Sequence, residues 1–536
     1  MGRTPLFHLL QRAARIARAS LHDPAPLDEF VDRGREMRID HARRRLLQGA
    51  GAGVLLAGCR TLAPQPGAGS EAEVAIVGAG IAGLTAAWRL RQQGVRVRVY
   101  EASGRIGGRI HSAQARLTPA SGETQVIELG GELIDSGHLR MRALADEFGL
   151  PLDDLAGDDP DRDTWYFDGR PIGEREIVAA FVPVAAAIER DLATLGDGDI
   201  LHDAPQGAQA LDALSIAQWL DRNGVSGWLR SLLDVAYTTE MGLETDQQSA
   251  LNLLTFIGTG GERFAVFGAS DERYHVRGGN QRITDALGAR LGDAIETGSV
   301  LESVRADADG HVLAFRRDGA TREVRARQVV LALPFTLLRR VRIDASLPPP
   351  QRRAIETLAY GTNAKLMIGF ADRAWRRHGA NGAAMSDLAF QTTWETTRGQ
   401  AGRGGVLTNF TGGRHGLALG EGTAAAQADT AAAALDRLFP GALNARADAG
   451  QARMHWPTQP WALGSYACLR PGDWTGVRGA IGASTGGLHF AGEHCALDNQ
   501  GFMEGGCESG EAAAAAVLRR LGRTVARVPW HGPPDS

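Results

Sequence analysis

One stretch near the N-terminus decides the fold, and it reads Glu73-Val74-Ala75-Ile76-Val77-Gly78-Ala79-Gly80-Ile81-Ala82-Gly83. The β-branched run at 73–77 predicts a buried parallel strand, and residues 84–93 predict the helix that follows it. A second strand is expected over 95–100. It ends at Glu101, where an acidic side chain is placed to accept the ribose hydroxyls of a dinucleotide.

Three glycines form the turn between this strand and this helix. Gly78 makes the tight turn, Gly80 lets the backbone approach a pyrophosphate, and Gly83 lets helix and strand pack closely. The phosphates are expected at the N-terminus of the helix. Among 69 glycines the GxGxxG spacing alone is a weak signal, but its strand-turn-helix-strand-acid context predicts a dinucleotide-binding fold.

The residues after Glu101 point to a particular nucleotide. The sequence Arg105-Ile106-Gly107-Gly108-Arg109 resembles the GG-R continuation of the FAD-dependent amine oxidase superfamily, which nicotinamide dehydrogenases lack. In that family the arginine at the position of Arg109 reaches the pyrophosphate. The resemblance therefore implies FAD as the cofactor.

The resemblance extends from residue 73 to about 522. The family that this span resembles includes monoamine, polyamine and L-amino-acid oxidases. It implies that Gly131 and Glu132 pass the flavin ring, and that the backbone of Val300 contacts adenine. The other matching stretches are 138–150, 324–334, 456–466 and 488–517.

A second strong motif lies near the C-terminus, at 489–506. There the resemblance places Gly492 and Glu493 beside the ribityl chain, followed by an Ala-rich helix over 505–521. Met503 is expected to donate its backbone N–H to the flavin N1 and C2 carbonyl region. A helix N-terminus aimed at that edge would stabilise negative charge on the reduced ring.

The chain contains a single lysine, Lys365, while the other 57 of its 58 basic residues are arginine. A coding bias explains the arginines, but lysine is a compact donor that arginine cannot replace where a point contact is needed. Lys365 lies on an apolar run that predicts a strand. The resemblance matches it to the family lysine that holds a water against flavin N5, with a role in imine hydrolysis or flavin reoxidation.

Aromatic residues complete the predicted site. Tyr466 and Phe502 match the two rings that flank the amine in amine oxidases, and Trp456 is expected as a supporting wall. Ser465 stands where monoamine oxidases have the cysteine that bonds covalently to the flavin. The FAD is therefore expected to be noncovalent.

The resemblance implies oxidation of an amine or L-amino acid to an imine, which is hydrolysed to an aldehyde or keto acid and ammonia, with O2 reduced to H2O2. Two alternatives remain: an amine dehydrogenase that passes electrons to a periplasmic carrier, and a desaturase or protoporphyrinogen-oxidase-like enzyme for an apolar substrate. A flavin-binding protein without turnover is disfavoured by the Lys365 motif. Some L-amino-acid oxidases grip the substrate carboxylate with an arginine shortly after the Leu-Gly-Gly turn, where this chain has Glu132-Leu133-Ile134-Asp135 instead. Glu132 is expected either to face a cation or to cap the next helix.

Composition restricts the other partners. With 536 residues, a net charge of −4 and 43% hydrophobic residues, the chain has the balance of a folded protein and no basic excess for nucleic acid. Its four cysteines and 14 histidines show no metal-ligand spacing, so no metal is expected. A homodimer is left open.

Residues 1–59 are predicted to be an export signal. Arg43-Arg44-Arg45-Leu46-Leu47-Gln48 resembles the twin-arginine motif, and an apolar run follows that is too short to span a membrane. Leu56-Ala57-Gly58-Cys59 resembles a lipobox, in which Cys59 would carry the lipid. The expected location is periplasmic, either free or as a membrane-anchored lipoprotein.

The expected fold class is α/β (α+β), with a Rossmann-like FAD-binding domain of the glutathione-reductase type and a substrate domain of mixed sheet and helices. The FAD-binding domain is expected from discontinuous segments, and residues 60–72 are expected to be a flexible linker. The predicted segments are 73–150, 275–340 and 483–525 for the FAD-binding domain, and 151–274 and 341–482 for the substrate domain.

Overall fold

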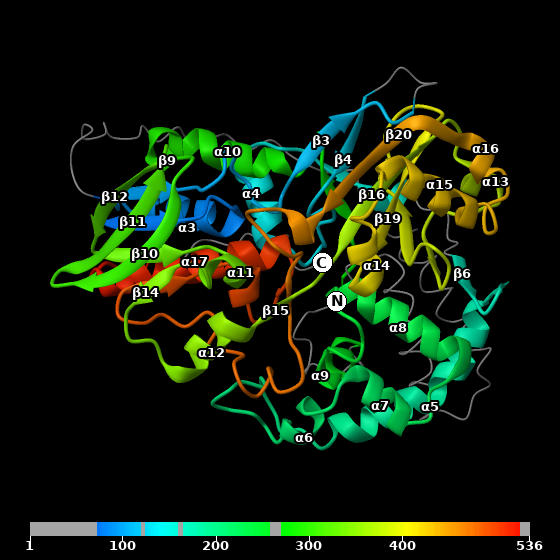
Figure 1. Cartoon of the computed structure of the whole chain (residues 1–536), viewed down its shortest axis with the longest axis horizontal. Coiled ribbons are helices and arrows are strands. Elements are labelled where there is room, and N and C mark those ends of the chain that lie inside the picture. Colours follow the sequence, from blue (N-terminus) through cyan, green and yellow to red (C-terminus); the bar gives the residue numbers. More distant parts are fainter. Residues whose placement is uncertain (1–71, 119–123, 159–163, 258–269, 526–536) are drawn as a thin grey trace, which may run out of the picture.

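The structure is a computed structural model that describes residues 72–118, 124–158, 164–257 and 270–525. The predicted export segment 1–59 lies outside the described residues, as does the predicted linker except for residue 72. The described chain is elongated, with one sheet near each end and a layer of helices along one side of the second sheet (Figure 1). The predicted α/β class is confirmed.

A five-stranded parallel sheet forms one end of the molecule, in the order β22-β13-β1-β2-β9. Its strands come from four separate parts of the sequence: β1 Val74–Val77, β2 Val97–Tyr100, β9 Ile295–Glu296, β13 Gln328–Leu331 and β22 Leu488–Phe490. Because parallel strands point the same way, the residues after β1, β2, β13 and β22 meet at one edge of the sheet.

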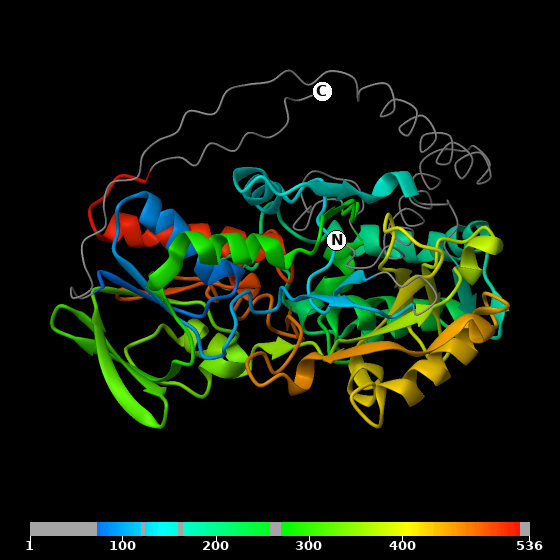
Figure 2. The ribbon, with the colours of Figure 1, turned by 90° about the horizontal axis from the view of Figure 1, so that it is seen from above.

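Both faces of this sheet are covered (Figure 2). Helices α3 (Ile81–Gln92), α10 (Gln281–Leu291) and α17 (Met503–Arg520) lie on one face. An antiparallel meander with one parallel strand lies on the other, made of β10 Val300–Asp307, β11 Gly310–Arg317, β12 Ala320–Ala326 and β14 Arg342–Asp344. Alternate residues of β1 therefore enter two cores, with Ile76 under the helices and Ala75 on the meander side.

Helix α3 begins three residues before the predicted position 84, at Ile81, so Gly83 lies in its first turn. A Cβ atom at Gly83 would lie 2.0 Å from the carbonyl oxygen of Gly78. Only glycine allows this approach of helix and turn, which is the packing role that the spacing predicts. The C-terminal helix also begins earlier than the predicted residue 505, at Met503.

A seven-stranded mixed sheet forms the other end, in the order β20-β16-β19-β18-β17-β6-β7. Its strands are β6 Thr164–Phe167, β7 Arg170–Pro171, β16 Ala364–Phe370, β17 Ala384–Ser386, β18 Thr392–Glu395, β19 Gly405–Thr411 and β20 Arg446–His455. Strand β16 is buried along its whole length and pairs antiparallel with β19 and β20. Lys365 is its second residue, opposite Phe410 of β19.

Helices α5 to α9 form a layer beside this sheet, and α8 contacts its strands (Figure 1). Their bounds are α5 Glu174–Leu192, α6 Gln209–Asp212, α7 Ile216–Arg222, α8 Gly227–Met241 and α9 Ala250–Phe256. The remaining helices are α4 Leu139–Glu147, α11 Phe335–Leu338, α12 Pro349–Thr357, α13 Ala374–Arg377, α14 Gly413–Ala418, α15 Ala424–Leu435 and α16 Ala442–Ala445. The remaining strands are β3 Ser112–Ala115, β4 Gln125–Glu128, β5 Leu152–Asp154, β8 Tyr274–Val276, β15 Ala359–Tyr360 and β21 Ala467–Cys468.

Within the described ranges, none of the helices combines the length and the apolar character that a membrane crossing requires.

Candidate active site

A cavity of about 310 Å³ lies between the two sheets. Residues directly after β1, β2, β13 and β22 line one part of it, and β16, β18 and β19 line another. Thirteen predicted site residues line it: Gly78, Gly80, Glu101, Arg109, Gly131, Glu132, Lys365, Trp456, Tyr466, Gly492, Glu493, Phe502 and Met503. The two other predicted residues, Gly83 and Val300, do not line it.

The glycine turn after β1 leaves room for a ligand. Gly78 has φ of +103°, and a Cβ atom there would lie 2.4 Å from the carbonyl oxygen of Ala332. At Gly80 the nearest atom to such a Cβ would be 3.9 Å away, in Gly108. The missing side chain of Gly80 therefore opens space in the cavity at the start of α3, where a phosphate is stabilised by free N–H groups.

Glu101 follows β2 and is held in one orientation. Its Oε2 accepts the N–H of Ala79 at 2.8 Å, and its Oε1 accepts the N–H and the hydroxyl of Ser103, each at 2.8 Å. The N–H of Ser299 donates to the Glu101 carbonyl at 2.8 Å, which brings the start of β10 to the edge of β2. Val300, one residue further on, stays a predicted adenine contact.

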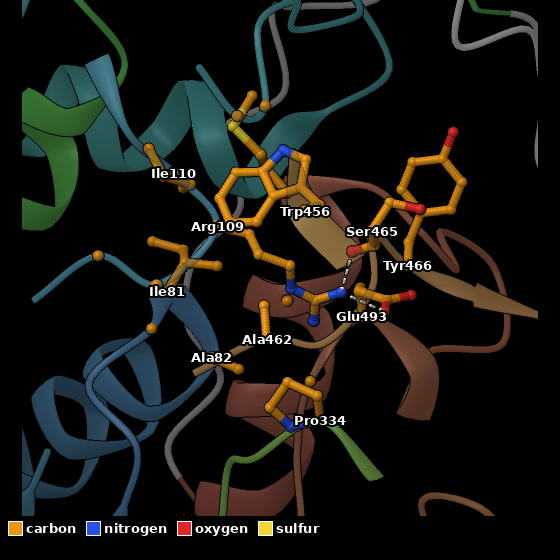
Figure 3. Close-up of a pocket in the computed structure, with 18 of the residues that line it drawn as sticks. Ile81, Ala82, Arg109, Ile110, Pro334, Trp456, Ala462, Ser465, Tyr466 and Glu493 are labelled. Atoms are coloured by element: carbon orange, nitrogen blue, oxygen red, sulfur yellow. Dashed lines mark hydrogen bonds and ion pairs between the residues drawn. The ribbon is translucent and has the colours of Figure 1, made fainter. Parts of the chain in front are cut away.

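Arg109 and Glu493 form a contact that the sequence did not indicate. Nη1 of Arg109 donates to Oε1 of Glu493 at 2.8 Å and to the carbonyl of Ser465 at 2.5 Å (Figure 3). The same carboxylate oxygen accepts the N–H of Ala467 at 3.1 Å. The Arg109–Glu493 pair thus links Ser465 and Ala467, which flank Tyr466, to the two predicted FAD-binding motifs.

The N-terminus of α17 enters the cavity next to Gly131. Phe502 caps this helix and Met503 is its first residue, so the Met503 N–H has no acceptor inside the helix. A Cβ atom at Gly131 would lie 2.7 Å from Cγ and Sδ of Met503. Glycine at 131 is therefore what lets this turn lie against the helix start.

His494 is a cavity residue whose role the sequence did not reveal. Its side chain is 2% exposed, and neither ring nitrogen has a hydrogen-bond partner among the described residues. Burial and the charge of Arg109 lower the pKa of His494 to about 4, although the charge of Glu493 acts in the opposite direction. The ring is therefore neutral near pH 7, with one donor and one acceptor for a ligand.

Lys365 and Glu132 form a buried ion pair. Nζ of Lys365 donates to Oε2 of Glu132 at 2.7 Å and to the carbonyls of Glu128 and Gly130 at 3.1 and 2.8 Å. These three acceptors match the three N–H donors of the ammonium group. Of the two interpretations of Glu132, the structure supports the one in which it faces a cation, since α4 begins at Leu139 with His138 as its N-cap.

Glu132 has further donors on β18 and just beyond it. Trp394 Nε1 donates to Oε1 at 2.9 Å, and the Thr396 hydroxyl donates to the same oxygen. Burial opposes ionisation of this carboxyl, but the charge of Lys365 and these hydrogen bonds together hold its pKa below the usual range. Glu132 is therefore a carboxylate, and the pair carries no net charge.

Aromatic side chains line the cavity beyond this pair. Tyr466 and Phe502 both line it, and the Tyr466 hydroxyl donates to the carbonyl of Thr239 at 3.3 Å. Trp456 also lines it, and its Nε1 donates to the carbonyl of Leu129 at 3.2 Å; its role as a supporting wall stays a prediction. Trp394 and Phe410 add a second aromatic pair, with ring centroids 5.4 Å apart, that the sequence did not single out.

The comparison with protein families identifies this arrangement. Residues 81–518 match the model of the flavin containing amine oxidoreductases, and the chain belongs to this family. It is thus a flavoenzyme that oxidises amines, and its cofactor is FAD. The residues fit such a group: Gly80 leaves an open approach to the start of α3, and α17 presents its first N–H groups. Among the described residues, neither ring nitrogen of His494 has a hydrogen-bond partner, so both are open to the cofactor.

Two relatives align with most of the chain. An L-amino acid dehydrogenase of Synechocystis sp. is 26% identical over 486 residues, which are 86% of this chain and 97% of the relative. A putative flavin-containing monoamine oxidase, AofH, of Mycobacterium tuberculosis is 27% identical over 473 residues, 84% of this chain and 97% of the relative.

Solved structures show the same fold. Cyclohexylamine oxidase from Brevibacterium oxydans has a TM-score of 0.74 at 24% identity, covering 85% of this chain and all of that one. Putrescine oxidase bound to putrescine has a TM-score of 0.71 at 23% identity, covering 84% of this chain and all of that one.

Proposed function

We propose that the protein is an oxidase that deaminates a primary or secondary amine or an L-amino acid. The observation that carries the proposal is that one continuous cavity joins the dinucleotide turn at Gly78 and Gly80 to an aromatic compartment at Tyr466 and Phe502. An apolar compartment with few polar groups binds the neutral amine, which is the form that is oxidised.

When bound, FAD would accept two electrons and one proton, the equivalent of one hydride, at N5 from the carbon that bears the amine. Tyr466 and Phe502 orient that carbon and keep bulk water away from it. The N–H groups at the start of α17 stabilise negative charge at their end of the site. The imine product is hydrolysed to an aldehyde or keto acid and ammonia, and O2 is reduced to H2O2.

The contacts of Lys365 restrict how it can hold a water molecule. All three of its donors already have protein acceptors, of which Glu132 is the only charged one. A water held by Lys365 therefore requires that one of these contacts be exchanged. The carbonyls of Glu128 and Gly130 belong to the segment that leads to Gly131, so the ammonium also fixes this segment.

A noncovalent flavin follows from the residue before Tyr466. Ser465 lines the cavity, and its hydroxyl donates to Oδ1 of Asn363 at 2.6 Å. A hydroxyl at this position forms no thioether. Acid precipitation of the purified protein should therefore release the FAD into the supernatant.

A dehydrogenase that passes electrons to a periplasmic carrier is the second candidate. It is favoured by the Synechocystis relative, whose name is L-amino acid dehydrogenase. We also propose export by the twin-arginine route, with Cys59 as a lipid anchor, on the strength of the motifs in residues 43–59. Radiolabelled palmitate incorporation into the full chain, lost in Cys59→Ser, tests the anchor.

One experiment separates the functional candidates. The full chain is purified with its flavin. Amines, polyamines, L-amino acids, a polyene and a porphyrinogen are each added without oxygen while the flavin absorbance is followed. Bleaching by amines supports the proposal, whereas bleaching only by a polyene or a porphyrinogen would support a desaturase-like enzyme. Oxygen is then readmitted with and without a cytochrome, and fast recovery with oxygen alone identifies an oxidase.

A further inference from the structure

A carboxyl group in the cavity has no role in the site described so far. Glu272 lines the cavity, is 6% exposed, and its Oε2 has no hydrogen-bond partner among the described residues. Its backbone is held at φ of +43°, a left-handed conformation that is unfavourable for glutamate. Such strain persists where the surrounding structure holds a side chain in place.

Asp135 holds Glu272 in this position and adds a second carboxyl. Its Oδ1 accepts the N–H of Glu272 at 2.7 Å and the hydroxyl of Ser270 at 2.7 Å. Asp135 is 1% exposed and also lines the cavity. The two carboxyls therefore reach the same compartment from two different segments of the chain.

His138 lies beside Asp135. Its Nδ1 accepts the N–H of Asp135 at 3.0 Å. Its Nε2 lies 3.3 Å from Oδ2 of Asp135. Two cations that line the cavity are already paired with other carboxylates, Lys365 with Glu132 and Arg109 with Glu493.

We infer that Glu272 and Asp135 form a carboxyl subsite that binds a second cationic group of the substrate, remote from the amine that is oxidised. The substrate class is then a diamine or an L-amino acid with a basic side chain. The inference rests on the proposed function for the reacting amine. The subsite itself is defined by the two carboxyls and is tested below without turnover.

The charges around Glu272 predict how the subsite responds to pH. Burial, Asp135, Glu240 of α8 and Glu132 raise the pKa of Glu272 well above its usual range, and only Arg398, which follows β18, opposes them. A carboxyl with a raised pKa is neutral at low pH and ionises as pH rises through that pKa. A bound ammonium or guanidinium group favours the ionised form, so affinity for a dication should increase with pH.

The kinetic test uses the FAD-loaded full chain and two matched substrate pairs: butylamine with 1,4-diaminobutane, and L-norleucine with L-lysine. In each pair the second compound adds only a distal ammonium group. The wild type should prefer the dicationic member. Glu272→Gln should raise its KM about 10- to 100-fold, the range for loss of a charge-assisted hydrogen bond, and leave the kinetics with the other member within about twofold.

Two further variants make the result specific. Asp271→Asn removes the adjacent carboxylate, which accepts hydrogen bonds from the N–H and hydroxyl of Ser136 and does not line the cavity. This variant should keep the wild-type kinetics with both members of each substrate pair. Glu272→Asp keeps the charge and should retain part of the preference. No preference in the wild type, or equal losses for both members in Glu272→Gln, would overturn the inference.

A binding measurement separates this inference from the proposed function. The enzyme is first reduced with dithionite without oxygen, so that it cannot oxidise an amine, and binding of 1,4-diaminobutane and butylamine is measured by calorimetry. Glu272→Gln should weaken binding of 1,4-diaminobutane and leave binding of butylamine unchanged. Binding that depends on Glu272 without turnover of any amine refutes the function but supports the subsite, whereas turnover with unchanged diamine binding refutes the subsite.

Discussion

Removal of the single lysine should destabilise the protein strongly, because it leaves a buried carboxylate without its cation. In Lys365→Met, the carboxylate of Glu132 stays 9% exposed and keeps only its contacts to Trp394 and Thr396. At the 2.7 Å separation and an effective dielectric constant of about 20, the lost Coulomb attraction is about 6 kcal/mol. Part of this is offset by the ammonium no longer being desolvated. We therefore expect the free energy of unfolding to fall by about 3–5 kcal/mol, as for other broken buried pairs.

Urea unfolding of the full chain at saturating FAD, followed by tryptophan fluorescence, measures this loss. The set comprises the wild type, Lys365→Met, Glu132→Gln and the double variant. Because the double variant removes both charges, it should lose much less than the sum of the single variants. The control is Arg342→Met, which breaks an exposed pair with Asp344 at 3.1 Å and should change the free energy of unfolding by about 0–1 kcal/mol.

A free energy of unfolding for Lys365→Met within about 1 kcal/mol of the wild-type value would refute this expectation, since a buried unpaired carboxylate would then be tolerated. Losses of the two single variants that simply add in the double variant would refute it as well. In that case the two side chains would stabilise the protein through separate contacts.

Three further predictions concern the flavin, its site and pH. By stopped flow, Lys365→Met should slow flavin reoxidation far more than amine-driven reduction, and the opposite order would refute the assigned role. Gly80→Val fills the open space at the start of α3 and should weaken FAD binding more than 10-fold in an equilibrium titration, while Gly137→Val, also in open space, should not. Burial, Arg520 and His311 lower the pKa of His489 to about 4, so the folded state binds fewer protons than the unfolded state below pH 6.5. Stability should fall as pH drops from 6.5 towards 4, by about 1.4 kcal/mol per pH unit, and His489→Gln should remove this part of the slope in unfolding curves measured at each pH.

The sequence predicts best which residues of the cofactor motifs come together along the cavity. These residues lie within short motifs in which spacing alone fixes the geometry, as between Gly78 and Gly80 or between Phe502 and Met503. The position of a helix start is less predictable. Gly83 has a low helix propensity, yet it lies in the first turn of α3 because close packing against Gly78 requires it there.

The contacts that cross the cavity could not be predicted from spacing. Glu132 meets Lys365 only because β16 places residue 365 against the turn that follows β4, and no local pattern encodes that register. The sequence singles out Lys365 as the one lysine among arginines, and Glu132 as an acid that follows two glycines. Neither signal predicts that the two side chains contact each other. Glu272 and Asp135 are likewise far apart in sequence, and their proximity depends on the contact of Ile134 with Tyr274 at the start of β8.

The order of strands in the parallel sheet also determines when, during translation, the cofactor pocket can form. Strand β22 completes one edge of this sheet next to β13, and α17 completes the layer over α3, yet both are made about 400 residues after β1. At about 5–20 residues per second, a ribosome needs roughly 20–80 s to cover that distance. The nucleotide turn at Gly78 thus leaves the ribosome long before the residues that close its pocket. Stable capture of FAD is therefore expected only after translation is nearly complete, and a nascent chain arrested before residue 488 should not retain it.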